Sequence, residues 1–150
     1  MSRPLLFLVA TAVTLLTTAL SARHPDEAAI RHTIQYYFDG GRAGDSVTLR
    51  KAFHPEARML FMRDSTFTAV PIGEYITRVG QNPPKPDAVD STQRRIVDID
   101  IAGDAAVAKL ELERPDMLIT DYMSLLRVDG RWVIVNKIFS RTAVKKQATR

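Results

Sequence analysis

The chain has 150 residues, a formal net charge of +4 and no cysteine, which excludes disulfides, thiolate catalysis and thiolate metal sites. The positive charge does not indicate a nucleic-acid partner, because residues 23–140 sum to −1 and the excess lies at the C-terminus. The basic residues of that end are Arg141, Lys145, Lys146 and Arg150. No aromatic residue among them could stack on bases, so we expect residues 142–150 to form a solvated basic tail.

The first 22 residues have the pattern of a secretory signal peptide. A short basic start precedes an uncharged apolar run from Leu5 to Leu20, and small residues follow at Ser21 and Ala22, where we expect cleavage. An uncleaved membrane anchor is the alternative, since the run is close to the minimum length for crossing a bilayer. We therefore expect a periplasmic or secreted protein without a membrane partner after cleavage, with one domain over residues 23–141.

Helical patterns occupy the first part of this domain. An amphipathic helix is predicted after Pro25 with a stop at the glycine pair 40–41. Its apolar positions recur at helical spacing: Ile30, Ile34, Tyr37 and Phe38. Asp45 is placed to cap a second, shorter helix, which should end at His54 because the residue before a proline is steered away from helical geometry.

Strand patterns dominate the rest of the chain. Two short strands are predicted over residues 57–62 and 66–70, and Pro71 suits the first turn of a third helix over residues 72–79. After a proline-rich loop the apolar period changes to two, which predicts four strands over residues 96–101, 105–113, 117–128 and 131–139. Helices followed by consecutive strands indicate an α+β domain with a bent antiparallel sheet.

The last two strands are joined by Asp129-Gly130, a dipeptide that favours a tight hairpin turn. Together with residues 37–45, 53–57, 121–122 and 136–139, this ending resembles the nuclear transport factor 2-like superfamily, and within it the branch of putative lumazine-binding proteins. The resemblance implies a cone-shaped curved antiparallel sheet with about three N-terminal helices, a pocket open at one end, and often a homodimer formed through the outer face of the sheet. It implies a small-molecule partner, pteridine-like or aromatic, and we expect no cofactor.

Steroid isomerases of this superfamily hold a phenol on the first helix and a carboxylate base after a phenylalanine-led turn. Tyr37 occupies the position of the phenol, but Phe61 stands where the base would be. A phenyl ring cannot abstract a proton, so the catalytic set does not carry over as a whole.

Four further polar residues are candidates for the pocket. His54 has a side chain suited to proton transfer near neutral pH, although a histidine before proline often only binds a turn carbonyl. Asp121 and Tyr122 alternate along one strand, so only one of them can face the pocket. Asn136 could orient a ligand, and Lys137 could pair with Asp121; a structural hydrogen bond and a salt bridge on the outer face are the alternatives.

Three hypotheses follow for the function. The first is an exported small-ligand-binding domain with Tyr37, His54, Asp121, Asn136 and Lys137 as pocket residues. The second is a cofactor-free isomerase, dehydratase or hydrolase that uses His54 or Asp121 as base and Tyr37 as hydrogen-bond donor. The third is a dimerisation module with a filled interior. No histidine spacing is typical of a metal site, so we expect no metal.

Overall fold

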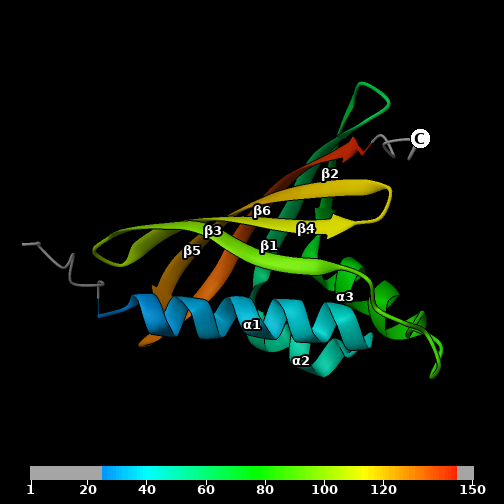
Figure 1. Cartoon of the computed structure of the whole chain (residues 1–150). Coiled ribbons are helices and arrows are strands. Elements are labelled where there is room, and N and C mark those ends of the chain that lie inside the picture. The colour runs from blue at the N-terminus through cyan, green and yellow to red at the C-terminus, as the bar shows by residue number, and fades with distance from the viewer. Residues whose placement is uncertain (1–24, 145–150) are drawn as a thin grey trace, which may run out of the picture.

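The computed structural model describes residues 25–144, which form three helices and one six-stranded sheet (Figure 1). The helices are α1 (Glu27–Ala43), α2 (Ser46–Ala52) and α3 (Ile72–Gln81). The strands are β1 (Phe53–Arg63), β2 (Thr66–Pro71), β3 (Gln93–Ala102), β4 (Ala105–Arg114), β5 (Met117–Val128) and β6 (Arg131–Ala143). The predicted signal peptide, and the tail beyond Val144, lie outside the described residues. Within residues 25–144, no helix combines the length and apolar character needed to cross a bilayer.

The strands follow the order β2-β1-β6-β5-β4-β3 across the sheet. Every neighbouring pair is antiparallel except β1 and β6, which run parallel. The long stretch of chain between these two strands permits that arrangement. The sheet curves over α1, and α2 and α3 lie close to the N-terminal end of β1 (Figure 1). The predicted α+β class and curved, mainly antiparallel sheet are confirmed.

The helix boundaries follow from two capping residues. The predicted stop of α1 at the glycine pair is wrong: α1 continues to Ala43 and ends at Gly44, whose φ of 68° is left-handed and whose N–H donates to the carbonyl of Gly40. Asp45 caps α2 as expected, since its Oδ1 accepts hydrogen bonds from the N–H groups of Val47 at 2.8 Å and Thr48 at 3.2 Å.

Several strands are longer than predicted, β1 and β6 among them. β1 already begins at Phe53, so His54 lies in a strand rather than in a turn. β6 continues to Ala143, so residues 142–143 belong to the sheet rather than to the basic tail. The Asp129-Gly130 hairpin turn is confirmed, with φ angles of 49° and 76°.

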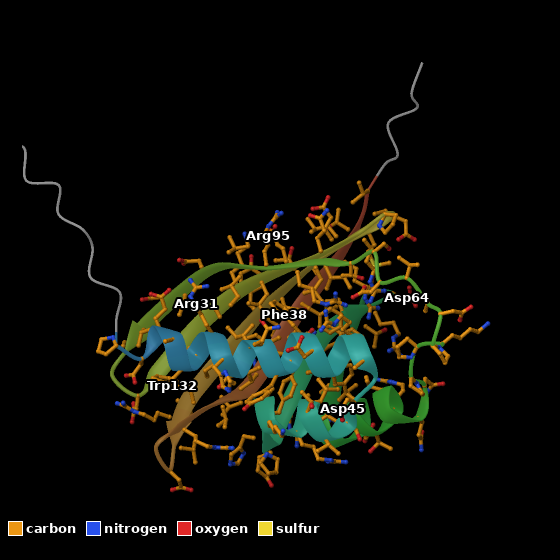
Figure 2. All side chains as sticks on the ribbon, turned by 60° about the horizontal axis from the view of Figure 1, so that its bottom comes forward. Arg31, Phe38, Asp45, Asp64, Arg95 and Trp132 are labelled. Atoms are coloured by element: carbon orange, nitrogen blue, oxygen red, sulfur yellow. The ribbon has the colours of Figure 1, made fainter. Side chains whose placement is uncertain are left out.

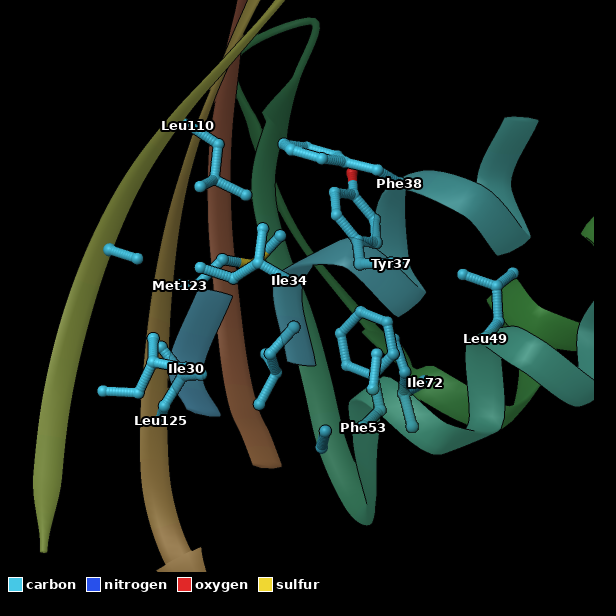
Figure 3. Close-up of a cluster of buried hydrophobic side chains, with 14 of the residues drawn as sticks. Ile30, Ile34, Tyr37, Phe38, Leu49, Phe53, Ile72, Leu110, Met123 and Leu125 are labelled. Atoms are coloured by element: carbon cyan, nitrogen blue, oxygen red, sulfur yellow. The ribbon is translucent and has the colours of Figure 1, made fainter. Parts of the chain in front are cut away.

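The core lies between α1 and the concave face of the sheet (Figure 3). Apolar residues of α1 pack there against residues of β4, β5 and β6; the fully buried ones are Ile30, Ile34, Leu110, Met123, Leu125 and Ile134. Thr33 also ties helix to sheet, because its hydroxyl donates to the carbonyl of Trp132 at 2.7 Å. Burial of this apolar face holds α1 in place beneath the sheet.

A β-bulge in β6 decides which residues face the concave side. Leu125 pairs with Ile134 and Ser124 with Asn136, so Val135 has no partner in β5. The extra residue reverses the alternation beyond it, and Lys137 therefore shares the inner side with Ile134. Strict alternation along β6 would put Lys137 and Ile134 on opposite faces, and the bulge is the reason that they share one.

Candidate ligand-binding site

A cavity of about 370 Å³ lies between the helices and the inner face of the sheet. This volume falls within the range of roughly 300–1,000 Å³ that is usual for small-molecule sites. Its apolar wall is made by Phe38, Met59, Phe61, Leu112, Ile119 and Phe139. Its polar lining consists of Tyr37, Tyr75, Arg63, Arg78, Arg94, Arg114, Lys137 and Arg141, and Gly41 completes it.

Three polar side chains meet at the floor of this cavity. The Tyr37 hydroxyl donates to Asp121 Oδ2 at 2.7 Å, and Lys137 Nζ donates to the Tyr37 oxygen at 2.7 Å. Lys137 Nζ also lies 2.9 Å from Asp121 Oδ1. The exposed fractions are 4% for Tyr37, 0% for Asp121 and 5% for Lys137. We call these three residues the floor triad.

Each member of the floor triad comes from a different element. Tyr37 lies on the inward face of α1, and Figure 3 shows its ring among Phe38, Phe53 and Ile34. Asp121 belongs to the inner row of β5, so Tyr122 points outward and is 42% exposed. Lys137 pairs with Met123, two residues from Asp121, which makes the ion pair a diagonal contact between β5 and β6.

The Asp121 carboxylate is satisfied unequally. Oδ2 accepts the Tyr37 proton, whereas Oδ1 faces the ammonium group outside hydrogen-bond geometry and has no other partner among the described residues. The contact at Oδ1 is therefore an ion pair held by charge rather than by a directed hydrogen bond. The carboxylate itself is fully buried, so a ligand in the cavity meets Tyr37 and Lys137 before it meets Asp121.

Burial sets the protonation of the floor triad. Burial, followed by the charge of Asp121, raises the pKa of Tyr37 well above its ordinary value of 10.0, so the phenol keeps its proton at neutral pH. Burial lowers the pKa of Lys137, while the Asp121 charge opposes this shift.

A lysine ammonium has three N–H donors. One is donated to Tyr37 and the ammonium group is also held by the ion pair with Asp121, which leaves donor capacity for a group in the cavity.

Tyr75 of α3 provides a second phenol on the cavity wall. Burial, followed by the charge of Asp121, raises the pKa of Tyr75 to about 12, while Arg78 and Arg114 oppose the shift. This phenol is therefore a neutral hydrogen-bond donor throughout the physiological range.

The raised pKa of Tyr75 predicts a loss of stability at high pH. The unfolded chain releases this proton near pH 10.0 and the folded chain near pH 12, so stability should fall as the pH rises between these values. From about pH 9 to about pH 11, the free energy of unfolding should drop by about 1 kcal/mol more in the wild type than in Tyr75→Phe. Urea denaturation at both pH values measures this difference. Equal losses in the two proteins would contradict the assignment.

The predicted site residues separate into two groups. Tyr37 and Lys137 line the cavity, and Asp121 lies directly behind them. His54 and Asn136 do not line it. His54 is only partly buried on β1, where its Nδ1 accepts from the Glu56 N–H at 3.2 Å, and Asn136 lies beside the bulge. The prediction that these two face the pocket is not met, because the early start of β1 and the bulge in β6 move them away from it.

Tyr75 and the five cavity arginines were not among the predicted site residues. Most of these arginines lie at or near strand ends, where a charged residue is ordinarily read as part of a turn. Their common feature is position in the folded chain, since five different elements bring them together. Only the pairing of strand ends could have revealed them.

Among residues 25–144, no group of three or more histidine, aspartate or glutamate side chains is arranged to hold a metal ion. The chemistry available in the cavity is therefore that of hydrogen-bond donors and cations: two phenols, one ammonium and several guanidinium groups. Phe61 lies in the cavity wall, so the place of the isomerase base is taken by an aromatic surface.

The fold and the cavity above α1 are those of the nuclear transport factor 2-like superfamily. A protein of this superfamily from Shewanella baltica OS155, of unknown function, is 30% identical with a TM-score of 0.67, covering 77% of this chain and 92% of its own. One from Methylobacillus flagellatus KT is 29% identical with the same TM-score, covering 79% and 93%. The model of the family described as putative lumazine-binding matches residues 25–140, and the chain belongs to this family.

Two further relatives carry functional names. The aldolase FrzH from Cladobotryum sp is 26% identical over 113 residues, which cover 74% of this chain and 87% of that protein. A structure described as a putative ketosteroid isomerase, from Shewanella frigidimarina NCIMB 400, has a TM-score of 0.56 at 15% identity and covers 77% of this chain and 98% of its own. At that identity, the second comparison concerns the fold alone.

Proposed function

We propose that this protein binds a small organic molecule in the cavity above the floor triad. The observation that carries the proposal is a cavity of about 370 Å³ in which the Lys137 ammonium group and two phenols face apolar and aromatic walls. A cavity of this size, with polar groups converging beside an apolar wall, is typical of sites that orient one ligand. A ligand carbonyl, ring nitrogen or oxyanion would take the remaining N–H of Lys137.

A thermal-shift series tests this proposal. Pteridines, flavins and small aromatic acids are the probes, in agreement with the description of the family. A ligand at about a hundredfold excess over its Kd stabilises the native state by about 2.7 kcal/mol, which raises the Tm by several degrees. Tyr75→Phe should reduce the shift, whereas Tyr122→Phe on the outer face should not. No shift with any probe would count against the proposal.

A second candidate function is an enzyme that makes or breaks a carbon–carbon bond next to a carbonyl group. It is supported by the cationic Lys137 N–H beside a Tyr37–Asp121 hydrogen bond, and by the similarity to an aldolase. Lys137 would polarise the carbonyl, and Asp121 would take up a proton through Tyr37, being buried too deeply to meet the ligand itself. His54 has no part in this version, since it lies outside the cavity.

The two candidates differ in what Tyr37→Phe would do. For an enzyme, cleavage of β-hydroxy carbonyl compounds should be lost in this variant while ligand binding is largely kept, because the proton path is broken and the cavity is not. For a binding protein, neither wild type nor variant should turn over these compounds. Turnover by Tyr37→Phe at the wild-type rate would refute the enzymatic proposal.

We propose in addition that the protein is exported and forms a homodimer. Export is supported by the N-terminal sequence pattern, and mass spectrometry of the mature protein should show cleavage after Ser21 or Ala22.

Dimerisation is supported by exposed apolar residues on β1, β2, β5 and β6: Met62, Phe67, Tyr122 and Ile138. Light scattering should then give twice the monomer mass, and Ile138→Lys should restore the monomer. The cavity counts against a role in dimerisation alone, for which a filled interior was expected.

A further inference from the structure

The mouth of the cavity is ringed by guanidinium groups from five separate elements. Arg63 ends β1, Arg78 lies in α3, Arg94 is near the start of β3, Arg114 ends β4, and Arg141 is near the end of β6. These residues are far apart in the chain, and the fold places all of them around one opening. With Lys137 at the floor, the cavity carries six cationic side chains.

No carboxylate of residues 25–144 lines the cavity to balance these charges. Arg94 has its own partner, since it contacts Asp90 at 2.6 Å. Arg63, Arg78, Arg114 and Arg141 have no carboxylate within ion-pair distance among residues 25–144. Asp121 lies behind the floor and is already engaged by Lys137 and Tyr37. A cavity lined by charges of one sign concentrates counter-ions from solution, and here these would be anions.

Two of the arginines are held against aromatic rings. The Arg141 guanidinium lies 5.0 Å from the centre of the Phe139 ring, and that of Arg63 lies 5.2 Å from the centre of the Phe61 ring. The two rings are themselves in contact, with centres 4.7 Å apart. Contact with a ring face limits the movement of a guanidinium group and leaves its N–H edge available. Cationic groups and an aromatic surface are therefore adjacent in the same wall.

We infer that the ligand of this cavity is an organic oxyanion: a molecule with a flat apolar body and a carboxylate, sulfonate or phosphate group. The body would lie against Phe61 and Phe139, and the anionic group would reach the guanidinium groups at the mouth, which match such oxygens in a bidentate manner. This inference rests on the proposed binding function and narrows it to one chemical class. A neutral ring system would leave the arginines without partners.

A matched pair of fluorescent probes tests the charge requirement. 8-Anilinonaphthalene-1-sulfonate and N-phenyl-1-naphthylamine have the same aromatic body and differ in the sulfonate. At low ionic strength, the full chain should bind the sulfonate probe at least about tenfold more tightly than the neutral probe. Added salt should weaken the binding of the sulfonate probe alone, because salt screens exposed charges. Displacement by 1-naphthoate or by 1-naphthyl phosphate would then distinguish a carboxylate from a phosphate ligand, and either result supports the inference.

Paired variants locate the binding site. The double variant Arg78→Gln, Arg141→Gln removes two charges from the mouth and should weaken binding of the sulfonate probe about tenfold or more. Arg50→Gln with Arg58→Gln removes the same charge from exposed positions outside the cavity and should leave Kd unchanged. Equal affinity for both probes, or equal weakening by both variant pairs, would overturn the anion inference while leaving small-molecule binding intact. Binding of neither probe would overturn this inference, and the absence of a shift in the thermal series would separately reject the binding function.

Discussion

Replacing Lys137 with methionine should lower the free energy of unfolding by about 3–5 kcal/mol, because it leaves the buried Asp121 carboxylate without its cation. Asp121 is 0% exposed and Lys137 is 5% exposed, so water cannot take the place of the lost partner. The variant also removes the hydrogen bond to the Tyr37 oxygen. Urea denaturation followed by circular dichroism measures the effect, provided that the wild type unfolds in one transition.

Two further variants show whether the unpaired charge is the cause. Adding Asp121→Asn to Lys137→Met removes the charge that was left unpaired, so the double variant should recover a large part of the loss. Lys109→Met is the matched control, because Lys109 lies on β4 and its nearest carboxylate is Glu111 at 3.9 Å. It should change stability by less than about 1 kcal/mol. A Lys137→Met variant as stable as this control would show that the ion pair contributes nothing.

Replacing Gly40 with alanine should destabilise the fold by about 1–3 kcal/mol through overpacking. A Cβ atom at this position would lie 2.7 Å from the backbone nitrogen of Leu49 and 3.0 Å from the carbonyl oxygen of Asp45. Backbone atoms of α2 cannot move aside as a flexible side chain would, so α1 and α2 must separate. The loss should be seen as a lower denaturation midpoint with an unchanged slope.

The same substitution at the neighbouring Gly41 should have the opposite effect on stability. A Cβ atom there meets nothing within 4 Å, and the residue lies inside α1. Gly41→Ala should therefore stabilise the protein by about 0.5–1 kcal/mol, because alanine loses less backbone entropy in a helix. If both variants were destabilised to the same extent, close contact between α1 and α2 would not be the cause.

The floor triad joins stability to ligand recognition. Asp121 fixes the proton of Tyr37 and holds the Lys137 ammonium group at the cavity floor, where one N–H remains for a ligand. Loss of Lys137 or of Asp121 should therefore affect folding and binding together, whereas Tyr37→Phe keeps the ion pair and should leave binding largely intact. Arginine variants at the mouth should affect binding alone, because these guanidinium groups have no carboxylate partner among the described residues, apart from Arg94. Figure 2 shows the side chains of the described residues on the ribbon, including Phe38 of the cavity wall.

Local sequence patterns were sufficient where a structural feature depends on neighbours in the chain. The Asp45 cap, the Asp129-Gly130 turn and the alternation that places Asp121 and Tyr122 on opposite faces each involve contacts within a few residues. The order of helices and strands likewise predicted an α+β fold with a curved sheet. The pairing of Lys137 with Asp121 was one of the predicted possibilities, with a salt bridge on the outer face of the sheet as the alternative, and the structure has the pair on the inner face.

Tertiary structure alone decided which residues make the site. Helix α1 passes Gly40-Gly41 because packing against α2 and the sheet outweighs the weak helix propensity of glycine. The bulge at Val135 turns Lys137 to the inner face, and no local pattern shows where a sheet will take up an extra residue. The arginine ring exists only because strand ends distant in the chain meet around one opening. The sequence by itself therefore determined the fold class and named Tyr37, Asp121 and Lys137 as candidates, whereas long-range strand pairing determined that Asp121 and Lys137 face inward and set the charge of the cavity.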